Sequence, residues 1–224
     1  SGNRCERGAG MEKSDKNMPN LFDYKYKRAF SYKVLKTDNA KHGTIGLPRV
    51  LNMYENYPLW AAFFTELGFA VRISGRSTHE MYEKGMDSIP SESACYPAKL
   101  VHGHIQDLLD KGMTTIFYPC IPYEQIEYSQ AGNHFNCPMV TSYPEVIYNN
   151  MDAVRAPGIR FIYPFVNLAD KPSFIRQMYK AFKDFGISRD EIEKAAGKGF
   201  AELKRYKDDI RKKGEETLKW IDEH

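Results

Sequence analysis

Short apolar runs recur along the chain from residue 43 onward, and each is bounded by glycine, proline or polar residues. Their content of β-branched and aromatic residues favours strands. The predicted strands are residues 43–47, 69–74, 114–118, 138–141 and 159–166.

Stretches with the apolar spacing of amphipathic helices lie between and after these runs. Pro58 suits the first turn of one such helix, and Gly68 suits its C-terminal end. A short helix is expected to begin at residues 77–80, with a hydroxyl residue as its cap. The other predicted helices are residues 57–67, 95–111, 143–148, 171–185 and 187–222.

Strands that alternate with helices predict an α/β fold, namely a three-layer, Rossmann-like parallel sheet with C-terminal helices. We expect an irregular N-terminal extension at residues 1–42 and an α/β domain that carries the site at residues 43–170. Helices at residues 171–224 are expected to pack on that domain or to extend from it. The irregular start suggests a fragment of a longer chain.

Composition narrows the function classes. Charged residues make up 27% of the chain, and no apolar run approaches the roughly 20 residues that span a bilayer, which argues against a membrane protein. The polar N-terminus is unlike a signal peptide, so a cytoplasmic location is expected. The net charge of +3 is weak, and the C-terminal lysines alternate with glutamates, so nucleic acid is not expected as a partner.

Three of the four cysteines, Cys95, Cys120 and Cys137, fall between residues 91 and 138, each next to or near a proline. Cys95 is expected to open a helix, Cys120 to close a strand, and Cys137 to precede a strand. In an open α/β sheet such positions converge on the crevice where cofactors bind. A reducing compartment keeps thiols free, so two interpretations stay open: inert core thiols, or a metal or cluster site.

Three segments resemble a known family: IGLPRVLNMYENYPLW at 45–60, SIPSESACYPAKLVHGHI at 88–105 and FYPCIPYE at 117–124. They are similar to the conserved region that accompanies CoA-substrate-specific enzyme activases. That region is related to subunits of 2-hydroxyacyl-CoA dehydratase and benzoyl-CoA reductase, and to double-cubane cluster proteins. The resemblance runs from about residue 3 to about residue 166.

The resemblance implies a 4Fe–4S cluster held by Cys95, Cys120 and Cys137, with Cys5 as a candidate fourth ligand. It also implies a partner, an ATP-dependent activase domain in the same longer chain or a separate one, which supplies electrons, and an acyl-CoA as substrate. Three cysteines beside an apolar cleft would favour catalysis, whereas four cysteines without a cavity would favour an electron relay or an activase-docking module. A structural zinc site completed by Cys5 or His134 is the third interpretation. No glycine-rich nucleotide loop occurs, so ATP is expected to bind elsewhere.

Other polar residues have simpler interpretations. His102 and His104 are two residues apart on one helix and cannot form a joint metal pair, so both are expected to be partly buried or surface histidines. The serines and glutamate at residues 91–93 are expected to cap the helix that starts at Cys95. Arg49 and Asn52 are expected at the same edge of the sheet, within reach of a phosphate or a carboxylate. Tyr123 and Glu124 are expected to shape a pocket there.

Overall fold

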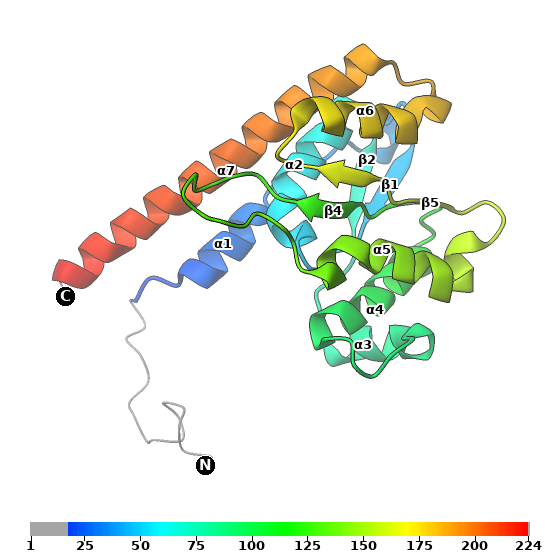
Figure 1. Cartoon of the computed structure of the whole chain (residues 1–224), viewed down its shortest axis with the longest axis horizontal. Helices are drawn as coiled ribbons and strands as arrows, with labels where there is room; N and C mark the ends of the chain where they lie inside the picture. The colour runs from blue at the N-terminus through cyan, green and yellow to red at the C-terminus, as the bar shows by residue number, and fades with distance from the viewer. Residues whose placement is uncertain (1–17, 224) are drawn as a thin grey trace.

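A parallel sheet of four strands forms the centre of the protein (Figure 1). The computed structural model describes residues 18–223. The strand order of the sheet is β2-β1-β3-β5, with Thr44 paired to Ala70, Gly46 to Ile116, and Thr115 to Arg160. The strands are β1 Thr44–Leu47, β2 Ala70–Ile73, β3 Thr115–Phe117 and β5 Arg160–Ile162.

A second, two-stranded parallel sheet extends the first. It pairs β4 (Cys120–Tyr123) with β6 (Phe165–Asn167). The backbone ladder continues between the sheets, because Tyr118 N donates to Ile162 O and Cys120 N donates to Pro164 O, both at 3.0 Å. The predicted strand at 159–166 is therefore split, since Pro164 has no N–H to give to the ladder. Cys120 begins β4 and does not close β3.

Helices cover both faces of the sheet, as the three-layer prediction requires (Figure 1). From β1 the chain crosses to β2 at one edge of the sheet, and from β2 it crosses back over β1 to β3 in the opposite direction. Because both crossovers are right-handed, their helices lie on opposite faces of the sheet. The helices are α2 Met53–Glu66, α6 Lys171–Phe182 and α7 Arg189–Glu223 on one side, and α3 His79–Gly85, α4 Tyr96–Asp110 and α5 Pro138–Asn150 on the other. Short 3₁₀ helices occur at Thr37–Asn39, Met86–Ser88, Asp152–Arg155 and Lys183–Phe185.

Two helix boundaries differ from the sequence prediction. α2 begins at Met53, so Pro58 lies inside the helix and not in its first turn. Burial of its neighbours Leu59 and Trp60 offsets the hydrogen bond that the proline removes. The predicted strand at 138–141 is wrong: these residues form the first turn of α5, where Pro138 occupies a position that needs no backbone donor.

The core between α2, the sheet and α6 is mainly aromatic. Trp60 and Phe64 of α2 each lie 4.9 Å from Phe117 of β3, measured between ring centroids. Phe174 of α6 stacks on Trp60 at 5.8 Å. All four rings are fully buried, and edge-to-face pairs of this kind stabilise a core beyond the area they bury.

Helices α3 and α4 cross at two glycines. A Cβ atom added to Gly103 would lie 1.6 Å from the carbonyl oxygen of Met81, and one added to Gly85 would lie 2.1 Å from the backbone nitrogen of Gly103. Only residues without a side chain allow this approach.

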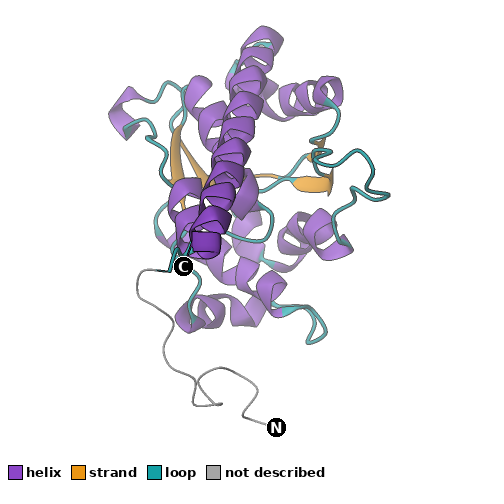
Figure 2. Cartoon of the chain, turned by 90° about the vertical axis from the view of Figure 1, so that its left-hand side faces the viewer, coloured by secondary structure: helices purple, strands orange, loops and turns teal. Residues whose placement is uncertain are grey.

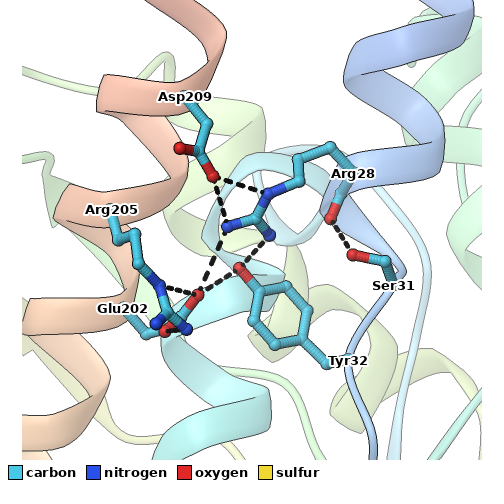
Figure 3. A network of polar contacts seen from close by, with 6 residues as sticks. All are labelled: Arg28, Ser31, Tyr32, Glu202, Arg205 and Asp209. Carbon is cyan, nitrogen blue, oxygen red and sulfur yellow. Dashed lines mark hydrogen bonds and ion pairs between the residues drawn. The ribbon is translucent and has the colours of Figure 1, made fainter.

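A polar network ties α1 (Leu21–Ala29) to the long helix α7 (Figure 3). Arg28 binds Asp209 at 2.8 Å and donates to the Tyr32 hydroxyl, which donates to Glu202 at 2.8 Å. Burial by itself lowers the pKa of Arg28, yet its hydrogen bonds to Tyr32 and Asp209 hold that pKa above its usual value. In Figure 2, α7 crosses in front of the strands and ends at the C-terminus.

Within residues 18–223, no helix combines the length and apolarity that crossing a membrane requires.

Candidate functional site

Cys95 is the N-cap residue of α4, and its side chain is exposed. Its backbone is extended, and its thiol makes no capping hydrogen bond. Ser91 and Ser93 do not cap the helix, contrary to the prediction. Their hydroxyl oxygens lie 2.7 Å apart, and Ser93 N donates to Ser91 Oγ, so they stabilise the preceding turn. Glu92 reaches Lys99 of α4 at 3.6 Å.

Cys137 holds the same position on α5. Its thiol is exposed, and Sγ accepts a hydrogen bond from Val140 N at 3.5 Å. The residue before it, Asn136, donates to Ile121 O at 2.8 Å, which brings the start of α5 against β4. The first turn of α5 therefore places Cys137 beside the strand that Cys120 begins.

Cys120 is fully buried. Burial and, to a lesser degree, the charge of Glu145 raise the pKa of its thiol to about 12, although a backbone hydrogen bond with Glu145 acts the other way. Cys120 thus faces the middle of α5. Because a helix rises about 1.5 Å per residue, Glu145 lies roughly 12 Å along α5 from Cys137.

Tyr143 of α5 connects this region to α4. Burial and, to a lesser degree, a Coulombic interaction with Cys95 together raise the pKa of Tyr143 to about 12. His102 Nε2 lies 3.1 Å from the Tyr143 hydroxyl, and His102 Nδ1 lies 2.7 Å from Ser88 Oγ. Burial lowers the pKa of His102 to about 4, so this histidine is neutral near pH 7.

His104, like His102, is fully buried, and the expected partly buried or surface positions are wrong for both. Its two ring nitrogens lie 2.7 Å from Ser74 Oγ and 2.9 Å from Ser77 Oγ. Burial lowers its pKa to about 4. His104 therefore joins α4 to the loop after β2, which is a structural role.

The three cysteines lie around α5, but they are not assembled into a metal centre. Among residues 18–223 there is no group of three or more His, Cys, Asp or Glu side chains placed to hold a metal ion. Cys5 lies outside the described residues. His134 is the other candidate for a zinc ligand, and its backbone carbonyl accepts a hydrogen bond from Glu124 N at 3.2 Å. The chain supplies thiol donors in one region, without a preformed site.

A second constellation surrounds the carboxylate of Glu124, which follows β4. Its Oε1 accepts hydrogen bonds from Asn52 at 2.9 Å, Asn136 at 2.9 Å and Asn56 at 3.1 Å. Its Oε2 accepts one from Asn56, also at 3.1 Å. Asn52 follows β1, so the carboxyl ends of β1 and β4 meet at this carboxylate.

A cavity of about 470 Å³ opens beside Glu124. Its lining includes Asn52 after β1 and Glu124 after β4, the strand that continues the ladder of β3, so it lies near the point where the strand order reverses direction. This point is the usual ligand crevice of an open α/β sheet. Leu51, in its lining, has φ 44°, a strained conformation for a residue with a side chain. The cavity is closed by α1, α2 and α7, through residues such as Tyr26, Tyr54 and Tyr206.

The sequence anticipated part of this site. Asn52 and Glu124 lie at the expected edge, and the carboxylate that Asn52 meets belongs to the chain itself. Arg49 turns instead toward α1, with its guanidinium 4.6 Å from the ring centroid of Phe30. Asn56 and Tyr206 were missed. An asparagine inside the apolar stretch of α2 is the one signal that pointed to a buried polar contact.

Comparison with known proteins gives one match. A family model described as CoA enzyme activase uncharacterised domain (DUF2229) matches residues 44–224. The match thus includes the C-terminal helices, beyond the residue 166 at which the sequence resemblance was expected to end. No curated protein and no solved structure shows a significant match. Because the family model covers well over half of the sequence, this chain belongs to the family of CoA enzyme activase-related domains.

Proposed function

We propose that this domain carries an iron–sulfur cluster in an activase-dependent system that acts on CoA substrates, similar to 2-hydroxyacyl-CoA dehydratase. Cys95, Cys120 and Cys137 are the proposed ligands. The observation that supports them is their common neighbourhood. Cys137 begins α5, next to Asn136, which bonds to the strand that Cys120 begins. Cys95 begins α4, which contacts Tyr143 of α5 through His102. Family membership supports the activase as a partner.

The donor chemistry fits such a cluster, although the geometry is not preformed. Thiolates are the usual ligands of iron–sulfur clusters, and three free thiols are present. Metal binding deprotonates a thiol outright, which would overcome the high pKa of Cys120. At Cys95 and Cys137, a thiolate would also be stabilised by the partial positive charge of a helix N-terminus. A bound cluster would supply one-electron redox chemistry.

An electron relay or activase-docking role is favoured over catalysis on a bound substrate. No cysteine lines the cavity beside Glu124. The same holds for two further cavities among residues 18–223, one beside Leu168 and Phe200 and one beside Tyr148 and Phe185. A thioester would need an apolar cleft beside the cluster to react there. Delivery of electrons to an acyl-CoA bound by a partner subunit agrees better with this arrangement, and Cys5 as fourth ligand would complete a relay cluster.

Anaerobic reconstitution with iron and sulfide tests the proposal. The wild type should gain the absorption and electron paramagnetic resonance spectra of a 4Fe–4S cluster, and Cys95→Ser, Cys120→Ser and Cys137→Ser should each lose most of them. Cys5→Ser tests the fourth ligand. Zinc binding without colour would favour the structural alternative, and His134→Ala would then separate the two zinc models. If all cysteine variants bind iron as the wild type does, the site assignment is wrong.

Thiol labelling provides an independent readout that needs no activity. In the native protein without iron, iodoacetamide should modify the exposed Cys95 and Cys137 and leave the buried Cys120 unmodified. Reconstitution should protect both exposed thiols, as measured by mass spectrometry of peptides. Labelling that iron and sulfide do not change would contradict ligation.

A further inference from the structure

The charges that line the switch-point cavity, the 470 Å³ space beside Glu124, do not balance. Two lysines and three glutamates line it. Lys25 pairs with Glu55, and Lys207 pairs with Glu127 at 2.6 Å. Among the described residues, Glu124 has amide donors and no cationic partner. The cavity therefore holds one carboxylate whose charge is not compensated, so it disfavours anionic ligands.

The hydrogen bonds to Glu124 leave one of its oxygen atoms available. Oε1 receives three amide donors, whereas Oε2 receives only one, from Asn56. A carboxylate oxygen accepts two or more hydrogen bonds, so Oε2 retains capacity for a donor in the cavity. The three asparagines fix the orientation of the carboxylate, because each is itself held by secondary structure or by a backbone carbonyl.

The remaining wall is mostly aromatic. Tyr26 and Phe30 of α1 lie 5.1 Å apart between ring centroids, and Phe30 lies 5.6 Å from Tyr54 of α2. Tyr206 of α7 is only 3% exposed, and its hydroxyl has no hydrogen-bond partner among the described residues. The strained backbone of Leu51, in the same lining, is a feature that clusters at ligand sites.

We propose that the switch-point cavity binds a small primary amine with an aromatic or branched apolar body. Its ammonium group donates to Glu124 Oε2, and its body packs against the rings of α1 and α2. The ammonium supplies the missing positive charge through a charge-assisted hydrogen bond. The rings of Tyr26 and Phe30 already contact the Arg49 guanidinium, so they serve the apolar body of the ligand and not its cation. This site is separate from the cysteines and does not depend on the proposed cluster.

Binding of 2-phenylethylamine to the full chain tests the charge requirement. Two probes of similar shape serve as controls, the neutral 2-phenylethanol and the anionic 3-phenylpropionate. In two-dimensional nuclear magnetic resonance spectra, the amine should shift the side-chain amide signals of Asn52, Asn56 and Asn136. It should bind about tenfold more tightly than the alcohol, and the carboxylate should not bind. No binding of the amine, or equal binding of the three probes, would overturn the proposal.

Glu124→Gln tests the residue. The variant removes the charge and keeps the shape, so the affinity for 2-phenylethylamine should fall about tenfold. Glu193→Gln, an equal change at an exposed position of α7 outside the cavity, should leave the affinity as it is. If Glu124→Gln binds the amine as tightly as the wild type does, Glu124 is not the recognition group. The comparison of the three probes on the wild type decides the matter even if this variant does not fold.

Discussion

Asn56 donates a hydrogen bond to each carboxylate oxygen of Glu124, and both bonds measure 3.1 Å. Asn56 is 3% exposed and lies on α2, while Glu124 follows β4, so this contact fixes the loop after β4 against the first crossover helix. It defines one wall of the switch-point cavity. Replacing this buried amide by a second carboxylate would put two negative charges next to each other.

Asn56→Asp should therefore destabilise the protein at neutral pH. Two carboxylates would then face each other at hydrogen-bond distance in a poorly solvated place, which we expect to lower the free energy of unfolding by about 2–4 kcal/mol at pH 7. The loss should shrink at about pH 4.5, because the pair can share a proton. Urea unfolding at the two pH values measures both effects. Asn149→Asp, on the exposed side of α5, is the matched control and should change the stability little; an equal loss in both variants would contradict the contact.

The two buried histidines should make stability depend on pH. Burial lowers the pKa of His102 and of His104 from 6.5 to about 4. Between these values the unfolded chain binds protons that the folded chain does not bind, so unfolding takes up protons and the free energy of unfolding falls as the pH is lowered. Each proton taken up costs about 1.4 kcal/mol per pH unit.

Replacement of either histidine should reduce this dependence. In urea unfolding between about pH 6.5 and pH 4.5, the slope of stability against pH should fall by up to about one proton in His104→Asn. Asn149→Ala, an exposed change that removes no titratable group, should keep the wild-type slope. A slope that His104→Asn leaves unchanged would show that His104 is already protonated in the folded protein.

The network between α1 and α7 should contribute to stability mainly through Arg28. Its side chain is 18% exposed and binds Asp209, which is 41% exposed. Because the pair is only partly buried, we expect Arg28→Met to lower the free energy of unfolding by about 1–3 kcal/mol and not by the larger cost of a fully buried pair. Arg205→Met is the control: Arg205 also binds Glu202, but it is 68% exposed, and its loss should cost less than about 1 kcal/mol. Similar losses in the two variants would contradict a special role of Arg28.

The glycine crossing of α3 and α4 should tolerate no side chain. Gly103→Ala would place a methyl group 1.6 Å from the Met81 carbonyl oxygen, so the helices must separate, at a cost of about 3 kcal/mol or more. Gly197→Ala on α7 meets no atom within 4 Å and should stabilise the protein by up to about 1 kcal/mol, because alanine favours a helix. Thermal unfolding of both variants distinguishes the steric clash at position 103 from the gain in helix propensity at position 197. A Gly103→Ala protein as stable as the wild type would show that the helices can shift freely.

Local patterns were sufficient to predict most of the fold. Gly68 ends α2 with a φ of 86°, and Thr78 caps α3 by accepting a hydrogen bond from Met81 N, as the sequence indicated. The error at 138–141 arose because a short apolar run after proline suits a strand as well as a helix start. In the structure, Cys137 has the extended backbone of an N-cap residue, so the run after it begins a helix. The amino-acid sequence alone does not show this backbone conformation.

The site was harder to predict because its contacts join distant segments. The carboxylate of Glu124 meets asparagines that lie 72, 68 and 12 positions away, and no periodicity encodes such pairs. The prediction that Cys95 opens a helix is confirmed. The prediction that Cys120 closes a strand is wrong, because the missing N–H of Pro164 divides the strand ladder and Cys120 begins the second part. Cluster ligation stays a prediction.

The contact between Arg28 and Asp209 joins positions 181 residues apart. A ribosome adds about 5–20 residues per second, so α1 emerges roughly 9–36 s before the segment of α7 that holds it. During this interval the aromatic face of α1 can pack on α2, for example against Tyr54, but the switch-point cavity lacks its Tyr206 wall. The cavity with its Tyr206 wall can therefore bind a ligand only after α7 has been synthesised, which would make that ligand a stabiliser of the folded domain and not an aid to its early folding.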